Sequence, residues 1–382
     1  MKRVLLIDPA ANGRWVSGSS YNNGLVNSLS SKCELTLAAA VDYELMERNI
    51  KLMNCFFKHS NTMKRGTLRS VIRLWEYVRG YIEIFCNLKR NNYDVIHIQW
   101  LLCYPLDALF VKYMKRHTGL LVYTAHNVLP HIDGEKQYKI LMKIYACMDK
   151  ILVHGENIKK EFQAYYPQLS DRVFIQHHGE YFNLSTQYDS SAIDRVLSEK
   201  IRQYKYIFLF SGNIFYNKGL DMLVNIWLTY FTNQNALLII TGEQTSTYKE
   251  YDRKKNEIDQ CDNIIRFEGF VDTNLFNFLA NTCDVMIMPY RHASMSAVIF
   301  TAACFKKTVI TTNVGALSEY LEDGTDSIIC SPDEESLYNA LYTVMQSRKR
   351  EEMKEMGERL SEHIHDKYSW EQIAEQLFKM IY

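Results

Sequence analysis

Short apolar runs alternate along the first half of the chain with segments in which apolar residues recur every three or four positions. The runs predict buried strands and the spaced segments predict helices, with a loop over 17–23. The expected strands cover 4–8, 35–40, 94–100, 120–125, 151–154 and 173–176, and the expected helices cover 24–29, 66–90 and 107–116. Alternating strands and helices indicate a parallel, doubly wound sheet.

The same alternation restarts after a polar, charged stretch at about 184–204, which we interpret as a linker followed by a helix. The expected strands of the second half cover 206–211, 236–241, 264–268, 284–289 and 308–312, and the expected helices cover 219–231, 273–281 and 296–305. The sequence therefore predicts an α/β protein of two Rossmann-like domains, 1–185 and 186–366. Ligands of such sheets bind beyond the carboxyl ends of the strands, so we expect the site in a cleft between two facing domains.

Composition narrows the function classes. The 382 residues carry 44 basic and 44 acidic side chains, which argues against a nucleic-acid-binding protein. Nine dispersed cysteines without a CxxC pair argue against a disulfide framework or a structural zinc site, and the histidines lack metal-ligand spacing. No signal or spanning segment is apparent, so we expect a cytoplasmic protein.

Three strand-to-helix loops in the second half carry candidate chemistry. Residues 212–219 (GNIFYNKG) combine glycines with Lys218, which suits a phosphate oxygen. Residues 289–297 place the small Ser296 and Ala297 before a helix, and residues 313–319 bring Gly315 and Glu319 to a strand end. Ordinary roles remain open for each, as a solvated lysine, a helix cap or a capping glutamate. In the first half, His126 ends a strand and should face the cleft, although a structural histidine is the plain alternative.

Together these segments resemble a glycosyltransferase of the GT-B fold, in or near glycosyltransferase family 4. They are similar to a branch of sugar transferases that act in bacterial polysaccharide synthesis. The resemblance covers nearly the whole chain and is carried by TAHNVLPH (124–131), GNIFYNKG (212–219), the run 283–324 and KYSWEQIAEQLF (367–378). It implies a hexosyltransferase that moves a sugar from a UDP- or GDP-sugar to a glycan or polyprenyl-linked acceptor, in surface polysaccharide synthesis. It also implies that 367–382 returns to the first domain.

The resemblance assigns roles to individual residues. His126 and Lys218 are the catalytic candidates, and Asn127 and His131 join His126 on the acceptor side. The donor-binding candidates are Gly18, Gly212, Asn213, Lys218, Arg291, Ser296, Ala297, Thr301, Gly315 and Glu319. No metal or other cofactor is expected, because a lysine, helix N-termini and backbone amides can stabilise the charge on a leaving diphosphate, which is the main electrostatic task. The resemblance also implies a retaining transfer.

The sequence departs from the family pattern at the donor loops. Ala293 and Thr301 replace the usual E-x7-E carboxylates, and Asn213 replaces an arginine, a charge that Arg291 is a candidate to supply. Two alternatives therefore stay open: a catalytically degenerate subunit that binds nucleotide sugars, and a GT-B nucleotide-sugar epimerase.

A membrane contact is the last expectation. Residues 51–90 carry nine basic and two acidic side chains together with aromatic residues at helical spacing. Such a helix can lie on an anionic membrane surface, which would make the protein peripheral on the inner face of the cytoplasmic membrane. The alternative is that its basic residues form only the solvated side of a helix packed on the sheet.

Overall fold

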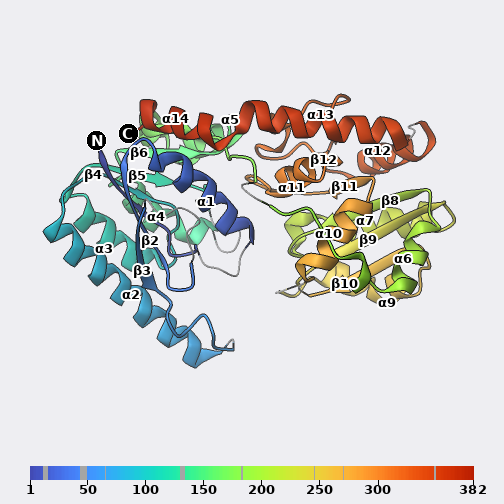
Figure 1. The fold of residues 1–382 in the computed structure, drawn as a ribbon, viewed down its shortest axis with the longest axis horizontal. Helices are drawn as coiled ribbons and strands as arrows, with labels where there is room; N and C mark the ends of the chain where they lie inside the picture. The colour runs from blue at the N-terminus through green and yellow to red at the C-terminus, as the bar shows by residue number, and fades with distance from the viewer. Residues whose placement is uncertain are drawn as a thin grey trace. The chain divides into compact units, whose positions relative to one another are not determined.

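The computed structural model describes residues 1–11, 16–43, 50–64, 66–129, 134–181, 184–244, 246–269, 271–347 and 350–382. Two compact units divide the chain: Met1–Asn183 with Tyr368–Tyr382, and Leu184–Lys367. Each unit holds one wholly parallel sheet with helices on both faces, which confirms the predicted α/β class (Figure 1).

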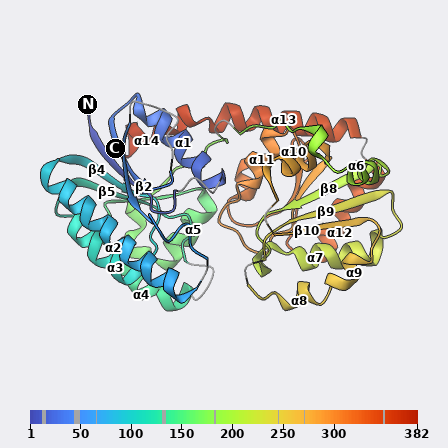
Figure 2. The same cartoon turned by 60° about the horizontal axis from the view of Figure 1, so that its bottom comes forward.

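The first unit contains a seven-stranded sheet in the order β3-β2-β1-β4-β5-β6-β7. Its strands are β1 (Arg3–Ile7), β2 (Glu34–Ala40), β3 (Lys51–Phe56), β4 (Tyr93–Ile98), β5 (Thr118–Thr124), β6 (Lys150–Val153) and β7 (Val173–Ile175). Its helices are α1 (Val16–Ser30), α2 (Thr67–Arg90), α3 (Tyr104–Met114), α4 (Gly134–Tyr145), α5 (Glu156–Tyr165), the 3₁₀ turn η1 (Pro167–Arg172) and α14 (Trp370–Met380). Helices α1 and α14 cover one face and α2, α3 and α4 the other (Figures 1 and 2).

The second unit contains a six-stranded sheet in the order β10-β9-β8-β11-β12-β13. Its strands are β8 (Tyr206–Ser211), β9 (Ala236–Gly242), β10 (Ile264–Glu268), β11 (Val285–Met288), β12 (Thr308–Thr312) and β13 (Ser327–Cys330). Its α-helices are α6 (Arg195–Arg202), α7 (Leu220–Ile226), α8 (Lys249–Asp252), α9 (Lys255–Asp259), α10 (Thr273–Thr282), α11 (Val298–Cys304), α12 (Glu334–Ser347) and α13 (Arg350–Tyr368). Its short helical turns are η2 (Ser190–Ala192), η3 (Tyr216–Lys218), η4 (Trp227–Phe231) and η5 (Leu317–Tyr320).

Buried apolar strands explain why these sheets form where the sequence predicts them. All residues of β9 except the last are buried, and Leu237 to Ile240 are completely inaccessible to solvent. A parallel strand covered on both faces is apolar on both, so it appears in the sequence as a continuous hydrophobic run. Every strand expected from such a run is present.

One local prediction is wrong. The expected loop over 17–23 lies inside α1, which begins at Val16. The segment's serines, asparagines and glycine suggest a loop from intrinsic preference. The packing of α1 against α14 overrides that preference, because Gly24 lies so close to Trp370 that a Cβ atom there would be 2.1 Å from the indole nitrogen.

Candidate functional site

Three loops come together at the carboxyl edge of the second sheet. They follow β8, β11 and β12, which are adjacent in the sheet order. The amide of Arg291 donates to the carbonyl of Asn217 at 2.8 Å, and the amide of Ala316 donates to the carbonyl of Ser294 at 3.0 Å. The segments 212–219, 289–297 and 313–319, which the sequence singled out separately, therefore form one site.

Two glycines allow this close approach. Gly219 has φ +63°, and a Cβ atom there would lie 1.9 Å from the carbonyl oxygen of Pro289. Gly315 has φ +58°, and its Cβ would lie 1.7 Å from the carbonyl oxygen of Ala293. Both positions require a left-handed backbone and contact without a side chain, which only glycine supplies. The glycines thus hold the first and third loops against the second.

Lys218 keeps its positive charge available in this site. The half-buried side chain belongs to η3, and its Nζ lies 3.7 Å from the centre of the Tyr290 ring. Within the described residues, no carboxylate forms an ion pair with Lys218. A cation over an aromatic face is held in place without losing its charge. This arrangement suits the capture of an anionic group.

Arg291 forms an ion pair within the protein, whereas the sequence suggested that it supplies a positive charge to the donor. Its guanidinium forms two hydrogen bonds with the carboxylate of Asp221, at 2.6 and 2.9 Å, and stacks over the Tyr216 ring at 4.4 Å. Tyr248 also donates its hydroxyl to Asp221. Burial tends to raise the pKa of Asp221, but the bonds from Arg291 and Tyr248 outweigh it and hold that pKa below its usual range. The charge of Arg291 is therefore balanced within the protein, which argues against a direct phosphate contact.

The remaining donor candidates lie around the same loops. Gly212 has φ +137° beside open space, Asn213 is exposed, and Ser296 is buried with its hydroxyl 3.1 Å from that of Tyr290. Ala297 immediately precedes α11, Thr301 donates its hydroxyl to the carbonyl of Ala297 at 3.2 Å, and Glu319 lies half-buried in η5. Thr301 therefore uses its hydroxyl within its own helix, where the family pattern has a carboxylate.

A neighbouring pocket escaped the sequence analysis. It opens beyond β9 and β10 and is lined by Glu243, Gln244, Ser246, Thr247, Asp252, Lys255, Glu268 and Gly269. The amide nitrogen of Gln244 donates to the Ser246 carbonyl and the Asp252 carboxylate, both at 3.0 Å. Both partners accept only, so the buried Gln244 Oε1, which has no partner within the described residues, is an acceptor. The sequence offered no signal for it, because glutamine in a loop is unremarkable by itself.

Aromatic and imidazole rings gather at the carboxyl edge of the first sheet, where the buried carboxylate of Asp8 also follows β1. Trp100 follows β4, His126 follows β5, His154 follows β6 and Gln176 follows β7, and these four strands are consecutive in the sheet. The His126 ring stacks on Trp100 with a 4.4 Å centroid separation and a 3° interplanar angle. Parallel strand order thus brings side chains together that are far apart in sequence.

Burial keeps the imidazoles of this cluster neutral. It lowers the pKa of His154 to about 4 and the pKa values of His97 and His178 to about 3. Burial is also the main reason that the pKa of His126 falls well below its usual range, with smaller contributions from His154, His178 and His97. The imidazoles of this cluster are therefore polar, uncharged groups at neutral pH.

The other first-unit candidates are less informative. Asn127 is half-buried next to His126, whereas His131 lies outside the described residues. Gly18 lies within α1, in a part of the helix whose side-chain surroundings are outside the description. Among the described residues, no three His, Cys, Asp or Glu side chains are grouped so that they could hold a metal ion.

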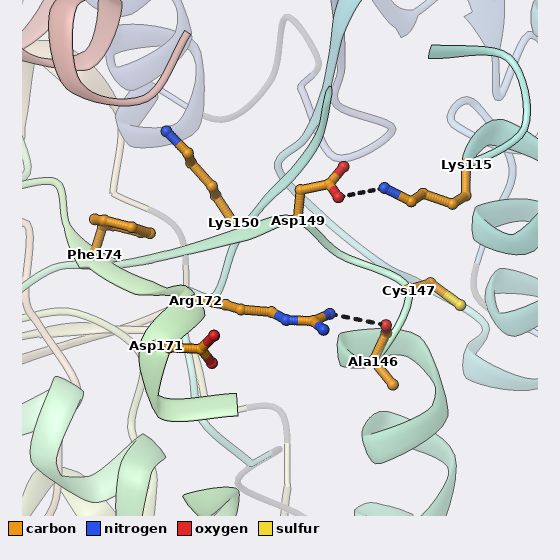
Figure 3. A pocket seen from close by; sticks show the side chains of 8 residues that line it. All are labelled: Lys115, Ala146, Cys147, Asp149, Lys150, Asp171, Arg172 and Phe174. Atoms are coloured by element: carbon orange, nitrogen blue, oxygen red, sulfur yellow. Dashed lines mark hydrogen bonds and ion pairs between the residues drawn. The ribbon is translucent and has the colours of Figure 1, made fainter. Parts of the chain in front are cut away.

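A separate pocket at the opposite edge of the first sheet does not share these features (Figure 3). Its three cations are Lys115, Lys150 and Arg172. Lys115 pairs with Asp149, Lys150 donates to the carbonyls of Met380 and Ile381, and Arg172 donates to those of Ala146 and Met148. Two of these cations stabilise helix carboxyl ends and the third pairs with a carboxylate, so all three have structural roles.

Comparisons with known proteins find similarity to glycosyltransferases. The family model described as glycosyl transferases group 1 matches residues 205–347. The chain is 24% identical over 256 residues to an uncharacterised 41.2 kDa protein in the cps region of Klebsiella pneumoniae, covering 65% of this chain and 68% of that protein. It is 23% identical to the 2-deoxystreptamine N-acetyl-D-glucosaminyltransferase of Niallia circulans, covering 76% of each.

Solved structures share the architecture at lower identity. Sucrose-phosphate synthase from Thermosynechococcus elongatus superposes with a TM-score of 0.71 at 16% identity, over 100% of this chain and 98% of that one. HepE from Anabaena, solved in complex with UDP, gives a TM-score of 0.68 at 13% identity, over 100% and 99%. These likenesses confirm the two-domain GT-B fold.

Proposed function

Because the chain is a glycosyltransferase of the GT-B fold, in line with the expected hexosyltransferase class, we propose that it transfers a sugar from a UDP- or GDP-sugar to a glycan or lipid-linked glycan. We assign it to family 4 or a close relative, with a role in surface polysaccharide synthesis. The observation that carries the proposal is Lys218, a cation without a carboxylate partner among the described residues, at the meeting point of three loops.

The reaction breaks the bond between the anomeric carbon and the diphosphate oxygen, so negative charge develops on the leaving nucleoside diphosphate. Lys218 is placed to stabilise this charge, together with backbone amides of the loops that Gly219 and Gly315 hold together. In a retaining transfer, the acceptor hydroxyl attacks from the leaving-group side and gives its proton to the diphosphate oxygen. No side-chain nucleophile or metal ion is then required.

The pocket beyond β9 and β10 suits the nucleoside part of the donor. It lies at the same sheet edge as Lys218, and the buried Gln244 Oε1 is placed to accept a hydrogen bond from a base N–H or a ribose hydroxyl. Structures of Anabaena HepE contain UDP and UDP-glucose. This favours a uridine nucleotide as the first donor to be tested.

The direct test is a panel of UDP- and GDP-sugars, read by thermal shift and by release of the nucleoside diphosphate in the presence of glycan acceptors. A ligand that binds only the folded chain raises its melting temperature. We expect one nucleotide class to raise it and to support turnover. The absence of a shift with every nucleoside diphosphate and nucleotide sugar would contradict the proposal.

A binding subunit is the second candidate, and one observation favours it. Neither Ala293 nor Thr301 carries a carboxylate, and the Thr301 hydroxyl is occupied within α11. A binding subunit would show the thermal shift without any nucleotide release, with water or with any acceptor. The same panel therefore separates the two candidates.

We also propose that the first unit contacts an anionic membrane through α2. The inner face of this helix is buried through Tyr77, Tyr81 and Ile84. Its outer face exposes Leu68, Val71, Leu74, Trp75 and Ile82, and the basic Arg79, Lys89 and Arg90 are also exposed. Leu68, Val71, Trp75 and Ile82 share one side of the helix by their spacing. An exposed apolar stripe with basic neighbours is typical of helices that lie in the headgroup layer.

No described helix is long and apolar enough to span a bilayer.

The structure also identifies which basic residues to change. Arg69 donates to the Ser60 carbonyl at 2.9 Å, and Arg73 donates to Asn61 at 2.8 Å and lies over the Phe57 ring. Both therefore support the fold. Trp75→Ser combined with Arg79→Gln, Lys89→Gln and Arg90→Gln should abolish flotation with anionic vesicles at low salt.

The control removes the same number of charges elsewhere, by changing Arg195, Lys200 and Arg202 of α6 to Gln. This variant should still float, and the wild type should detach at high salt. Equal flotation with neutral and anionic vesicles would contradict the membrane proposal.

A further inference from the structure

A chain of two hydrogen bonds links three strand ends of the first sheet. His154 Nδ1 lies 2.9 Å from the carbonyl oxygen of Gln176, and His154 Nε2 lies 3.1 Å from His126 Nδ1. The chain runs from the end of β7 to the end of β6 and on to the end of β5. Because these strands are adjacent and parallel, the three groups lie in register along one edge.

The carbonyl fixes where the protons are. A carbonyl oxygen only accepts, so His154 must carry its proton on Nδ1 and donate it to Gln176. A neutral imidazole has one N–H, which leaves His154 Nε2 as an acceptor. His126 must then donate from Nδ1, and its own Nε2 carries a lone pair. The low pKa values of both rings agree with this neutral arrangement.

The lone pair of His126 is held in one direction. Its Nε2 is buried and has no hydrogen-bond partner among the described residues. The ring stacks on Trp100, and Tyr21 meets it edge-on at 5.6 Å. An unpartnered buried acceptor costs free energy unless a ligand supplies the donor. Sugar hydroxyls are such donors.

We infer that His154 is a positioning residue, which holds His126 in the Nδ1–H tautomer so that Nε2 accepts a hydrogen bond from a sugar hydroxyl. The inference rests on the proposed sugar transfer only for the claim that a sugar hydroxyl donates the hydrogen bond to His126. The tautomer itself follows from the Gln176 carbonyl and does not depend on that proposal. His154 acts through His126, because its two ring nitrogens are used within the chain of bonds.

The tautomer can be measured without substrate, by ¹⁵N NMR of the full chain labelled at histidine nitrogens. Spectra of His126→Gln and His154→Gln assign the two rings. We expect His126 Nδ1 to resonate as a protonated nitrogen and Nε2 as a bare one. A protonated Nε2 on His126 would overturn the inference, whatever the enzyme transfers.

Kinetics then test the positioning role. His154→Phe keeps a ring of similar shape but removes the acceptor for His126, and should lower kcat/KM for transfer by about tenfold, the scale of one hydrogen bond. His154→Gln restores an acceptor oxygen and should recover most of that loss. The Kd for UDP or GDP should not change in either variant.

Two results would contradict the role of His154. One is equal loss in both variants with an unchanged His126 tautomer, which would indicate packing alone. The other is a His154→Phe variant with wild-type kinetics. If His154→Phe does not fold, His154→Gln and the wild-type tautomer still decide the inference. Failure of the proposed function would appear separately, as absence of nucleotide binding and turnover in the wild type.

Discussion

The strands of the two sheets follow the same order, but different kinds of side chain gather at the carboxyl edges of the two sheets. The first edge gathers buried imidazole and aromatic rings around His126, and burial keeps the imidazoles neutral. The second edge gathers glycine-rich loops around Lys218, which has no carboxylate partner among the described residues, and a partly buried ion pair between Arg291 and Asp221. Neutral acceptors suit sugar hydroxyls, whereas a half-buried cation suits a diphosphate. The comparison teaches that strand order assembles both sites, and that burial keeps the imidazoles of the first one uncharged.

Replacing Lys218 should have the largest effect. Lys218→Ala removes the retained charge of the second edge, and a charge-assisted bond to phosphate is worth about 1.5–3 kcal/mol. We expect the Kd for the nucleotide sugar to rise by roughly 10- to 150-fold. Titration calorimetry measures it, with the exposed Lys249→Ala as the control. Unchanged affinity would move the diphosphate site away from these loops.

Arg291→Gln should separate a positioning role from a ligand role. The variant leaves Asp221, which is largely buried, without its cation, so we expect the second unit to lose about 1–3 kcal/mol of stability. Donor affinity of the folded fraction should change less than in Lys218→Ala. Thermal unfolding and calorimetry on the same preparation check both expectations. A stable variant with strongly weakened donor binding would restore Arg291 as a phosphate ligand.

His126→Ala should lower transfer with little effect on nucleotide affinity. The variant removes the lone pair of the first edge, and we expect kcat/KM to fall by about tenfold or more while the Kd for UDP or GDP stays constant. His126→Ala that unfolds early but retains wild-type specific activity when folded would assign His126 a purely structural role.

Acid should weaken the first unit in a defined window. The unfolded chain binds protons at its histidines near pH 6.5, whereas native His154 does so only near 4. Stability therefore falls as pH drops through this window, by about 1.4 kcal/mol per pH unit for each such histidine. Asp8 and Asp107, whose pKa values burial raises to about 6, act in the opposite direction.

A variant without His154 measures how much this one histidine contributes to the pH dependence of the first unit's stability. His154→Gln should make the pH dependence of first-unit unfolding shallower by about 1.4 kcal/mol per pH unit between pH 6.5 and 4. Urea titrations at several pH values measure it, with NMR titration of the histidines beside them. An unchanged slope, or a His154 midpoint near 6.5, would show that the first edge is not held neutral by burial.

Removing metal should have the smallest effect. If Lys218 and the loop amides stabilise the leaving group, transfer should survive EDTA with its rate unchanged. Complete loss of activity with rescue by Mg²⁺ or Mn²⁺ would show that a metal ion supplies the charge at the second edge instead.

The sequence predicted the sheets better than it predicted the sites. Buried runs such as 236–241 are apolar on both faces and could be recognised directly. The edge strands β3 and β13 were missed, because fewer of their residues are buried and their patterns are weaker. The start of α1 was wrong because its polar residues favour a loop until α14 packs on it.

Residue pairing across the sheets could not be predicted at all. Lys218 was found because it lies within one loop, where local spacing is informative. The partnership of Arg291 with Asp221 joins residues 70 positions apart. The link from Gln176 through His154 to His126 requires the sheet order, since His154 by itself is one more histidine after a strand. Local sequence cannot supply that order.

Hydrogen–deuterium exchange of the full chain, with and without UDP or GDP, tests the central claim most directly. The account predicts slower exchange in 212–219, 289–297 and 313–319, with the amides around His126 and His154 unchanged in the absence of acceptor. Lys218→Ala should reduce that protection at the same nucleotide concentration. Protection confined to the first unit, at its ring cluster or at the pocket of Figure 3, would contradict it, as would no protection with either nucleotide.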